Sequence, residues 1–284
     1  MRLTPTLRRT AAAVAAITVA GAGAVTGEAS AAGGGKARSL KTYDRVAYAT
    51  TSNGQLVRFN ASDASKLTGA KGITGLPAGV TLAGIDFRPA TGDLYGVGSD
   101  SVVYRVNPKT AIAVAEATAF TPALSGTSFG IDFNPVVDKI RAVSDSGQNL
   151  RLNVDEGTVL GVDGNLNPGS PKVVGAAYTN SSFNATKPTA TTLYVVDAAT
   201  DKLYTQMPPN AGTLVMGKSL GSDVYGAVGF DIAGAGNVGY LALQRPLGSR
   251  FYAVNVLTGA TQSLGRVGGD GPRLTVTGLA VDQD

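Results

Sequence analysis

Three aspartates recur at one position of a short repeated motif, and their side chains could serve as acids, bases or metal ligands. Asp86, Asp132 and Asp231 each follow a glycine and one apolar residue, and each precedes another apolar residue. Matching positions of a repeat take matching places in a fold, so we expect these carboxylates to approach a common channel or the seams between repeats. Carboxylate oxygens suit Ca²⁺, which makes the three aspartates candidates for a calcium or ligand site. Their repetition favours the alternative, that each accepts hydrogen bonds from the backbone of the neighbouring repeat.

A second polar group of residues belongs to two loops of the third repeat. The first loop, Ser144–Asn149, precedes Arg151, and the second is Asp163–Asn167. The second loop begins like a D-x-N-x-N calcium loop but lacks the glycine at position six and the glutamate at position twelve. Side chains that bond their own turns are the competing interpretation. The ligand-binding candidates are Arg141, Asp145, Gln148, Asn149, Arg151, Asp163, Asn165 and Asn167.

Arg141 interrupts a column of aromatic residues. The equivalent position of the other repeats holds Tyr48, Tyr95, Tyr194 and Tyr240. A charged side chain in such a column needs a partner, and we expect Asp145 or another nearby carboxylate to provide it in a structural ion pair. A ligand-binding arginine is the alternative. For the tyrosines we expect packing between repeats, because a sugar-stacking surface would favour Trp, which the chain lacks.

Missing residue types exclude several kinds of chemistry. The chain has no Cys and no His, and its glutamates are Glu28, Glu116 and Glu156. Disulfides, thiol catalysis, iron–sulfur clusters, histidine-based zinc or copper sites and Ser-His-Asp triads are therefore excluded. Any polar chemistry must come from Asp, Asn, Gln, Arg, Tyr and backbone groups.

The elements that would position these residues follow from the repeat. Hydrophobic residues make up 43% of the chain and charged residues 15%, and 38 Gly and 13 Pro indicate an all-β protein with many turns. A short apolar strand recurs at steps of 46, 45, 54 and 49 residues and begins at Gly84, Gly130, Gly175, Gly229 and Gly278. Two further strands follow it, the second ending in a polar turn, and a less regular fourth strand completes each unit.

These units predict an all-β, five-bladed β-propeller with the C-terminal strand completing the N-terminal blade. The first unit, Val46–Asn60, lacks its opening strand, whereas the last opening strand, Thr277–Asp282, has no strands after it. A closed ring explains both observations and leaves no exposed edge at the seam. A jelly roll or a twisted sandwich is the alternative, but neither requires five in-phase copies with offset ends. An open solenoid would need polar capping repeats, which the sequence lacks. In the fourth unit, the insertion Thr179–Thr191 is expected on the lower face.

The N-terminal residues have the features of an export signal. Arg2, Arg8 and Arg9 precede a mildly apolar run from Thr10 to Ala24, and Ala29–Ala31 has the small-x-small form that signal peptidase cleaves. The arginine pair is compatible with the twin-arginine route. A retained membrane helix is the alternative, which the short, Ala-rich run disfavours.

We therefore predict a signal peptide over 1–31, a flexible leader over 32–44 and the propeller domain over 45–284 of a secreted protein. Removing residues 1–31 takes away three arginines and one glutamate, which leaves a net charge of about +2 from the full chain's +4. Without a basic stripe, nucleic acid is not an expected partner. We expect a monomer that is not embedded in the membrane after processing.

Several motifs together resemble one known family. The central ones start at Gly84 (GIDFRPATGDLYG), Gly130 (GIDFNPVVDKIR), Val143 (VSDSGQNLRLN) and Asp163 (DGNLN), and shorter ones start at Ala177, Thr192 and Pro208. From about Val46 to the C-terminus the chain is similar to a bacterial family of secreted proteins known as domain of unknown function 4394. The resemblance implies the extent of the domain and its export, and it carries no activity.

Three functions remain open at this level. We favour a non-catalytic extracellular module that binds a peptide, a glycan or a component of the cell envelope. The alternatives are a structural envelope protein stabilised by Ca²⁺ and a glycoside-processing enzyme that uses channel aspartates. The enzyme would need an acid and a base about 5 to 9.5 Å apart. No cofactor other than Ca²⁺ is expected.

Overall fold

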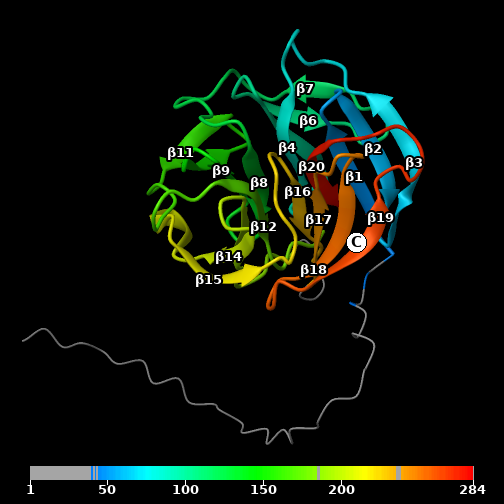
Figure 1. Cartoon of the computed structure of the whole chain (residues 1–284). Coiled ribbons are helices and arrows are strands. Elements are labelled where there is room, and N and C mark those ends of the chain that lie inside the picture. The colour runs from blue at the N-terminus through cyan, green and yellow to red at the C-terminus, as the bar shows by residue number, and fades with distance from the viewer. Residues whose placement is uncertain (1–39, 41, 43, 184–185, 235–237, 284) are drawn as a thin grey trace, which may run out of the picture. The chain divides into compact units, whose positions relative to one another are not determined.

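Five antiparallel sheets are arranged in a ring around a central axis (Figure 1) in the computed structural model, which describes residues 40, 42, 44–183, 186–234 and 238–283. We call the region along this axis, between the inner strands, the channel. Each sheet has four strands and forms one blade. Blade 1 contains β20 (Val276–Val281), β1 (Val46–Thr51), β2 (Gln55–Asn60) and β3 (Asp63–Gly72). Blade 2 contains β4 (Leu82–Phe87), β5 (Leu94–Gly98), β6 (Val103–Val106) and β7 (Ala113–Ala115). The predicted five-bladed propeller is thus confirmed.

The remaining blades repeat this meander from the channel outward. Blade 3 contains β8 (Phe129–Asn134), β9 (Lys139–Ser144), β10 (Asn149–Asn153) and β11 (Thr158–Val162). Blade 4 contains β12 (Val173–Tyr178), β13 (Leu193–Asp197), β14 (Lys202–Gln206) and β15 (Leu214–Ser219), with the short 3₁₀ helix η1 (Pro209–Ala211) before β15. Blade 5 contains β16 (Gly229–Ile232), β17 (Val238–Leu243), β18 (Arg250–Asn255) and β19 (Thr261–Arg266).

Blade 1 is closed by strands from both ends of the domain. β20 pairs antiparallel with β1, with Ala47 opposite Val281 and Ala49 opposite Leu279. The C-terminal strand therefore completes the N-terminal blade, as the offset ends of the repeat predict. Each inner strand pairs with one strand of its own blade and packs against the inner strands of the neighbouring blades, so β20 closes the ring between β16 and β4.

The glycine that opens each repeated motif lets the inner strands of neighbouring blades pack closely. A Cβ atom at Gly130 would lie 2.5 Å from the backbone nitrogen of Ala176 in blade 4, and one at Gly84 would lie 2.7 Å from the Ile131 side chain in blade 3. Such distances are well below van der Waals contact. The glycine ring therefore closes the middle of the channel.

Aromatic side chains fill the seams between blades, as expected for the tyrosine column. Tyr240 is fully buried and stacks on Phe251, with ring centroids 5.7 Å apart, and Phe251 meets Phe59 of blade 1 edge-on at 5.0 Å. Tyr95 of blade 2 meets Phe133 of blade 3 at 5.6 Å. Each buried ring removes a large apolar area from water, which holds neighbouring blades together.

The insertion of blade 4 covers the lower end of the channel, the end where the first and second strands of each blade connect. It leaves β12 at Tyr178 and returns at Leu193. The Phe183 ring packs edge-on against Phe87 of blade 2 at 5.5 Å. The Ser181 carbonyl lies so close to Gly234 of blade 5 that a Cβ there would be 2.0 Å from its oxygen. The segment thus reaches from blade 4 to blades 5 and 2.

The predicted signal peptide and most of the predicted leader lie outside the described residues. At the end of that leader, the Leu40 amide donates a hydrogen bond to Gln262 Oε1 of β19 at 2.6 Å, and Asp44 accepts one from Asn60 of β2. Within the described part of the chain, no helix has the length and apolarity needed to cross a bilayer.

Candidate functional site

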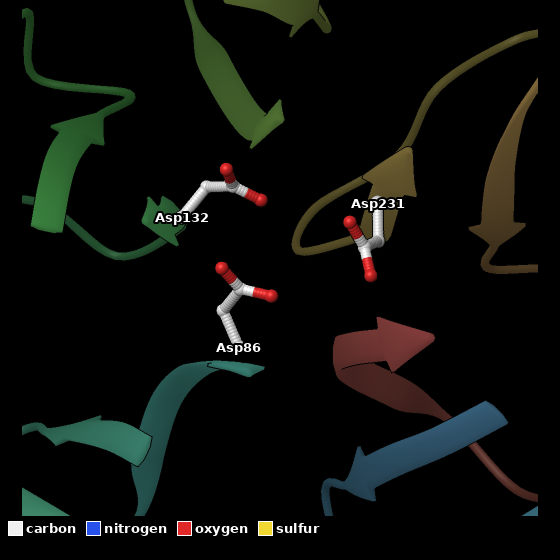
Figure 2. A group of neighbouring side chains, drawn as sticks. All are labelled: Asp86, Asp132 and Asp231. Carbon is white, nitrogen blue, oxygen red and sulfur yellow. The ribbon is translucent and has the colours of Figure 1, made fainter. Parts of the chain in front are cut away.

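The three repeated aspartates meet in the channel and form what we call the channel cluster. Asp86 lies on β4, Asp132 on β8 and Asp231 on β16, and each is at most 2% exposed. Their carboxyl groups point toward one another (Figure 2), and one oxygen of each lies within 4.8 Å of the others. The expected convergence on the channel is therefore observed.

A backbone amide of the neighbouring blade donates to one oxygen of each carboxylate. Asp86 Oδ2 accepts a hydrogen bond from the Phe133 amide of blade 3 at 2.7 Å. In the same way, Asp132 Oδ1 accepts from Tyr178 of blade 4 at 2.9 Å, and Asp231 Oδ2 accepts from Val281 of blade 1 at 2.6 Å. Each aspartate thus joins its blade to the next, which is the structural role that the repetition favours.

Alanines at the same motif position explain the remaining bonds of the cluster. Blades 4 and 1 carry Ala177 and Ala280 at this position. Blades 5 and 2, which follow them in the ring, therefore receive no hydrogen bond acceptor from a carboxylate of the preceding blade. In those two blades the aspartate also accepts the amide that follows it: Asp86 Oδ1 from Phe87 at 2.7 Å, and Asp231 Oδ1 from Ile232 at 2.5 Å. Three carboxylates therefore serve the equivalent amide of all five blades.

Burial raises the pKa of all three carboxyl groups. For Asp86 and Asp132 the pKa lies well above the usual 3.8, because burial and then the charges of neighbouring aspartates penalise ionisation. Burial raises the pKa of Asp231 to about 6, although hydrogen bonds from Val281 and Ile232 favour its charged form. Like charges this close cannot all ionise, so the cluster holds protons near neutral pH.

This geometry limits the chemistry that the channel cluster can perform. A glycoside-processing site needs carboxyl groups that a sugar ring can reach, whereas these are at most 2% exposed and bonded to backbone. A cation is chemically compatible with the oxygen donors. It would have to displace protons and share oxygens that already accept amide bonds.

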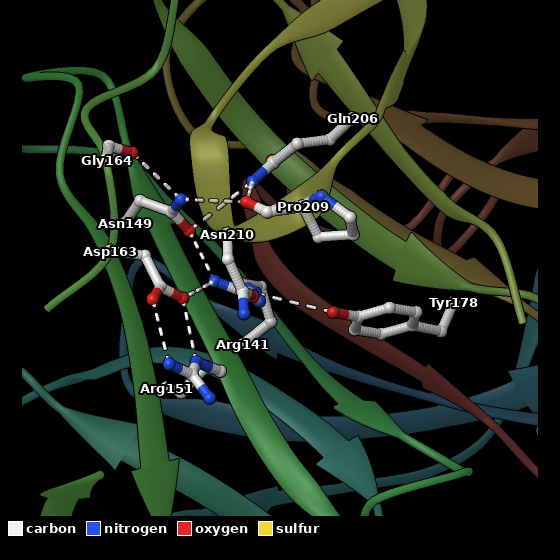
Figure 3. Close-up of polar contacts among 9 residues, drawn as sticks. All are labelled: Arg141, Asn149, Arg151, Asp163, Gly164, Tyr178, Gln206, Pro209 and Asn210. Carbon is white, nitrogen blue, oxygen red and sulfur yellow. Dashed lines mark hydrogen bonds and ion pairs between the residues drawn. The ribbon is translucent and has the colours of Figure 1, made fainter. Parts of the chain in front are cut away.

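Arg141 is the centre of the polar group predicted in the third repeat (Figure 3). It is 2% exposed, and its Nη1 donates to Asp163 Oδ2 at 2.6 Å and to Asn149 Oδ1 at 2.7 Å. Nη2 donates to Asn210 Oδ1 at 2.7 Å, and Nε donates to the Tyr178 hydroxyl at 3.3 Å. The guanidinium therefore joins blades 3 and 4.

Asp163 binds a second arginine of blade 3. Arg151 donates from Nε to Oδ2 at 2.8 Å and from Nη2 to Oδ1 at 2.9 Å, a bidentate arrangement. Burial opposes ionisation of Asp163, but the hydrogen bonds from Arg151 and Arg141 hold its pKa below the usual value. The expected structural ion pair of Arg141 is present, with Asp163 as its partner instead of the suggested Asp145.

The other loop candidates also bond within the protein. Asp145 accepts from the backbone amide and hydroxyl of Thr127, and Gln148 donates from its amide nitrogen to the Ala123 carbonyl at 2.8 Å. Asn167 donates to the Asn165 carbonyl at 2.9 Å. The structure therefore gathers Arg141, Asn149, Arg151 and Asp163 into one network. Among the described residues, no hydrogen bond joins the side chains of the other four candidates to it.

Sequence reasoning missed a second buried arginine. Arg88, just after β4, makes bidentate bonds to Asp138 at 2.9 and 2.7 Å and to Asp155 at 2.7 and 3.1 Å. The hydrogen bonds that Arg88 donates to Asp138 are the main reason that the pKa of Arg88 is raised. Both acids lie in turns of blade 3. Asp138 is 50 residues and Asp155 is 67 residues from Arg88 in the sequence, so no local motif indicates that they pair.

The upper end of the channel contains a pocket that sequence reasoning also missed. It has a volume of about 330 Å³ and lies where loops of blades 1, 2, 3 and 5 converge. Its lining includes seven hydroxyl side chains and no charged residue. They are Thr51, Ser52, Thr81, Ser99, Thr127, Ser128 and Thr277. We call this site the top-face pocket; the scattered Ser and Thr that build it have no distinctive spacing in the sequence.

Comparisons with other proteins identify the family. The chain is similar to Kuenenia stuttgartiensis hydrazine synthase, with a TM-score of 0.41 and 13% identity over 70% of this chain and 52% of that one. It is similar to a Lactobacillus plantarum protein, with a TM-score of 0.42 and 18% identity over 84% of this chain and 71% of that one. It is also similar to the Dos1 propeller, with a TM-score of 0.41 and 10% identity over 77% of this chain and 58% of that one. The chain thus spans about half the length of the hydrazine synthase chain. Among curated proteins, none matches this sequence. The model of the family described as "Domain of unknown function (DUF4394)" matches residues 55–280, and the chain therefore belongs to that family.

Proposed function

We propose that the protein is a non-catalytic extracellular binding module whose top-face pocket recognises a small, neutral, hydroxyl-rich group such as the end of a glycan. The observation that carries this proposal is the lining of the pocket, where hydroxyl groups from several blades face one concavity without a charged side chain. A neutral ligand with many donors and acceptors can pair with such groups, because each hydroxyl both donates and accepts.

Several of these hydroxyls are available to a ligand. Those of Ser52, Thr81 and Ser128 make no hydrogen bond within the described part of the chain. Ser128 is 6% exposed, so its hydroxyl would be costly to leave unpaired unless water or a ligand reached it through the pocket. Next to it, the bonds from Thr127 to Asp145 hold the loop in place. A rigid wall lowers the entropy cost of binding.

Residue types and the N-terminal segment support the other parts of the proposal. The chain has no His and no Cys and contains three glutamates, so it lacks the commonest general base and the thiol nucleophile. The arginine-led apolar segment before Ala31 supports export. A binding module needs neither reactive side chain, and a closed ring presents its loops on a rigid frame.

A glycan and peptide array probed with the protein lacking residues 1–31 tests the proposal. We expect retention of neutral glycans, and Thr81→Val and Ser128→Ala should each weaken binding about three- to tenfold through loss of one hydrogen bond. Thr110→Val, in an exposed turn of blade 2 outside the pocket, is the matched control. Retention of peptides alone, a silent array, or variants that bind as well as the control would contradict the proposal.

A calcium-stabilised structural role is the second candidate, and one observation favours it. Asp132 Oδ2, unlike the other oxygens of the channel cluster, accepts no hydrogen bond within the described residues. A cation could use this oxygen. Thermal unfolding in millimolar CaCl₂ and in EDTA tests this role, because a bound ion raises the melting temperature and an unchanged value contradicts it.

A further inference from the structure

The third strand of blades 1, 2 and 3 carries an arginine at one register position. Arg58 lies opposite Tyr48, Arg105 opposite Tyr95, and Arg151 opposite Arg141. Across the outer strand, these arginines pair with Gly69, Val114 and Gly161, respectively. The three positions are therefore equivalent, and the charges around them can be compared directly.

Blades 2 and 3 provide this arginine with a carboxylate from the outer strand. Glu116 lies two residues beyond Val114, and its Oε1 is 2.9 Å from Arg105 Nε. Asp163 lies two residues beyond Gly161 and is 2.8 Å from Arg151 Nε. Blades 4 and 5 have no charge at either position, with Thr205 and Gly217 in one and Ala253 and Leu264 in the other.

Blade 1 reverses the sign at the carboxylate position. Two residues beyond Gly69 stands Lys71, so a second cation replaces the counter-ion of Arg58. Neither side chain forms an ion pair with a carboxylate of the described residues. Two like charges in place of an ion pair are unfavourable unless an anion from outside neutralises them.

A cavity lies at this position, which we call the seam cavity. It has a volume of about 400 Å³, is bounded by β2, β3 and the β6–β7 turn of blade 2, and has no acidic residue in its lining. Its cations are Arg58, Lys71 and Lys109. Gly69 and Ala70 contribute almost no side-chain volume to the wall, which leaves the hollow open.

The contacts in the seam cavity orient its donors. The Arg58 guanidinium lies 6.0 Å from the centre of the Tyr48 ring, and its Nη1 donates to the Thr68 hydroxyl at 3.4 Å. Lys71 Nζ donates to the Lys109 carbonyl at 2.7 Å, which brings the β3 lysine to the blade 2 turn. Apolar side chains, among them Leu56 and Pro108, complete the wall.

We propose that the seam cavity binds a phosphate monoester, with the phosphate held by Arg58, Lys71 and Lys109 and a small organic group against Tyr48 and Pro108. Three cations match a dianionic phosphate better than a single carboxylate. The volume has room for an organic group of a few carbon atoms beside the phosphate. This site is distinct from the top-face pocket and does not depend on the function proposed for it.

Titration calorimetry with glycerol 3-phosphate at low ionic strength tests the proposal. We expect one site per chain, binding that weakens as NaCl is raised, and weaker or absent binding of acetate and glycerol. The decisive variant is Lys71→Glu, which gives blade 1 the pattern of blades 2 and 3 and offers Arg58 an internal partner. Loss of the favourable charge and competition by the new carboxylate should weaken binding at least tenfold.

Lys66→Glu is the matched control, because Lys66 is an exposed residue of the same strand outside the cavity and the change in net charge is identical. It should leave the affinity within about twofold, since separated surface charges are screened. Thermal unfolding checks that both variants fold, and Arg58→Gln is a second variant that should also lose binding. No binding to the wild-type protein, equal binding of acetate, or equal effects of the two lysine variants would overturn the proposal.

Discussion

The channel cluster makes the stability of the fold depend on pH in a direction that can be tested. Its carboxyl groups have a higher pKa in the folded chain than in the unfolded chain, so the folded state binds more protons between the two values. Stability from this source is complete below about pH 3.8 and is lost as the pH rises through the folded value, about 6 for Asp231. For Asp86 and Asp132, whose pKa is raised further, the loss continues to higher pH.

The magnitude follows from Asp231. A rise of its pKa from 3.8 to about 6 corresponds to a loss of about 3 kcal/mol of unfolding free energy between acid and neutral pH. Asp132→Asn reduces this penalty, because the amide oxygen can still accept from Tyr178 and the new NH₂ group can donate to a neighbouring carboxylate. We therefore expect the stability of the variant relative to wild type to rise between pH 4 and pH 8.

Urea unfolding followed by far-UV circular dichroism and tyrosine fluorescence measures this difference, since the chain has no Trp. Subtracting the unfolding free energy of the wild type from that of the variant at each pH cancels the contribution of carboxylates elsewhere in the protein. Asp270→Asn, at a fully exposed carboxylate, is the control and should give a difference that does not depend on pH. A flat difference for Asp132→Asn, or a variant that becomes relatively less stable as the pH rises, would refute this account of the cluster.

Three further changes test the framework around the cluster. Asp86→Ala should cost more stability than Asp132→Ala in urea unfolding, because it leaves two buried amides unpaired instead of one, at about 1 to 3 kcal/mol each; equal costs would contradict the bond pattern. Removing residues 277–284 takes most of β20 from blade 1 and should lower the melting temperature sharply. An unchanged melting temperature would contradict the closure of the ring by β20. Arg141→Met should destabilise the fold by about 3 kcal/mol or more by breaking its buried ion pair with Asp163, again measured in urea; a neutral effect would show that Arg151 alone suffices.

Much of the fold could be predicted from the sequence because its repeat is local. A glycine followed by an apolar residue and then Asp or Ala marks each inner strand, and the spacing of these motifs sets the number of blades. The offset ends of the repeat predict the ring closure. The first unit, from Val46, lacks an inner strand, and the C-terminal strand, from Thr277, lacks a blade, so the two can pair. The glycines themselves have a steric reason, since at Gly130 no Cβ fits against blade 4.

The sequence alone determined the kinds of group that the sites could use, and tertiary contacts decided which groups pair. The sequence indicates that Arg141 needs a carboxylate, because it stands in a column of tyrosines. Its partner is Asp163 and not Asp145, which is nearer in the sequence, because of how the blade 3 loops fold. Arg88 and its acids meet across a seam that no local pattern reveals. Hydrogen bonds and ion pairs act over a few ångströms, so chain separation says little about them until the blades are packed.

The functional surfaces divide in the same way. Three aspartates in phase predict a channel cluster, yet only the packing of the blades into a ring decides that these groups are buried and hold protons. The top-face pocket and the seam cavity have no signal in the linear order, because each draws side chains from several blades. The charge reversal at Lys71 stands in the sequence, but it becomes visible only when the strand registers align it with Glu116 and Asp163.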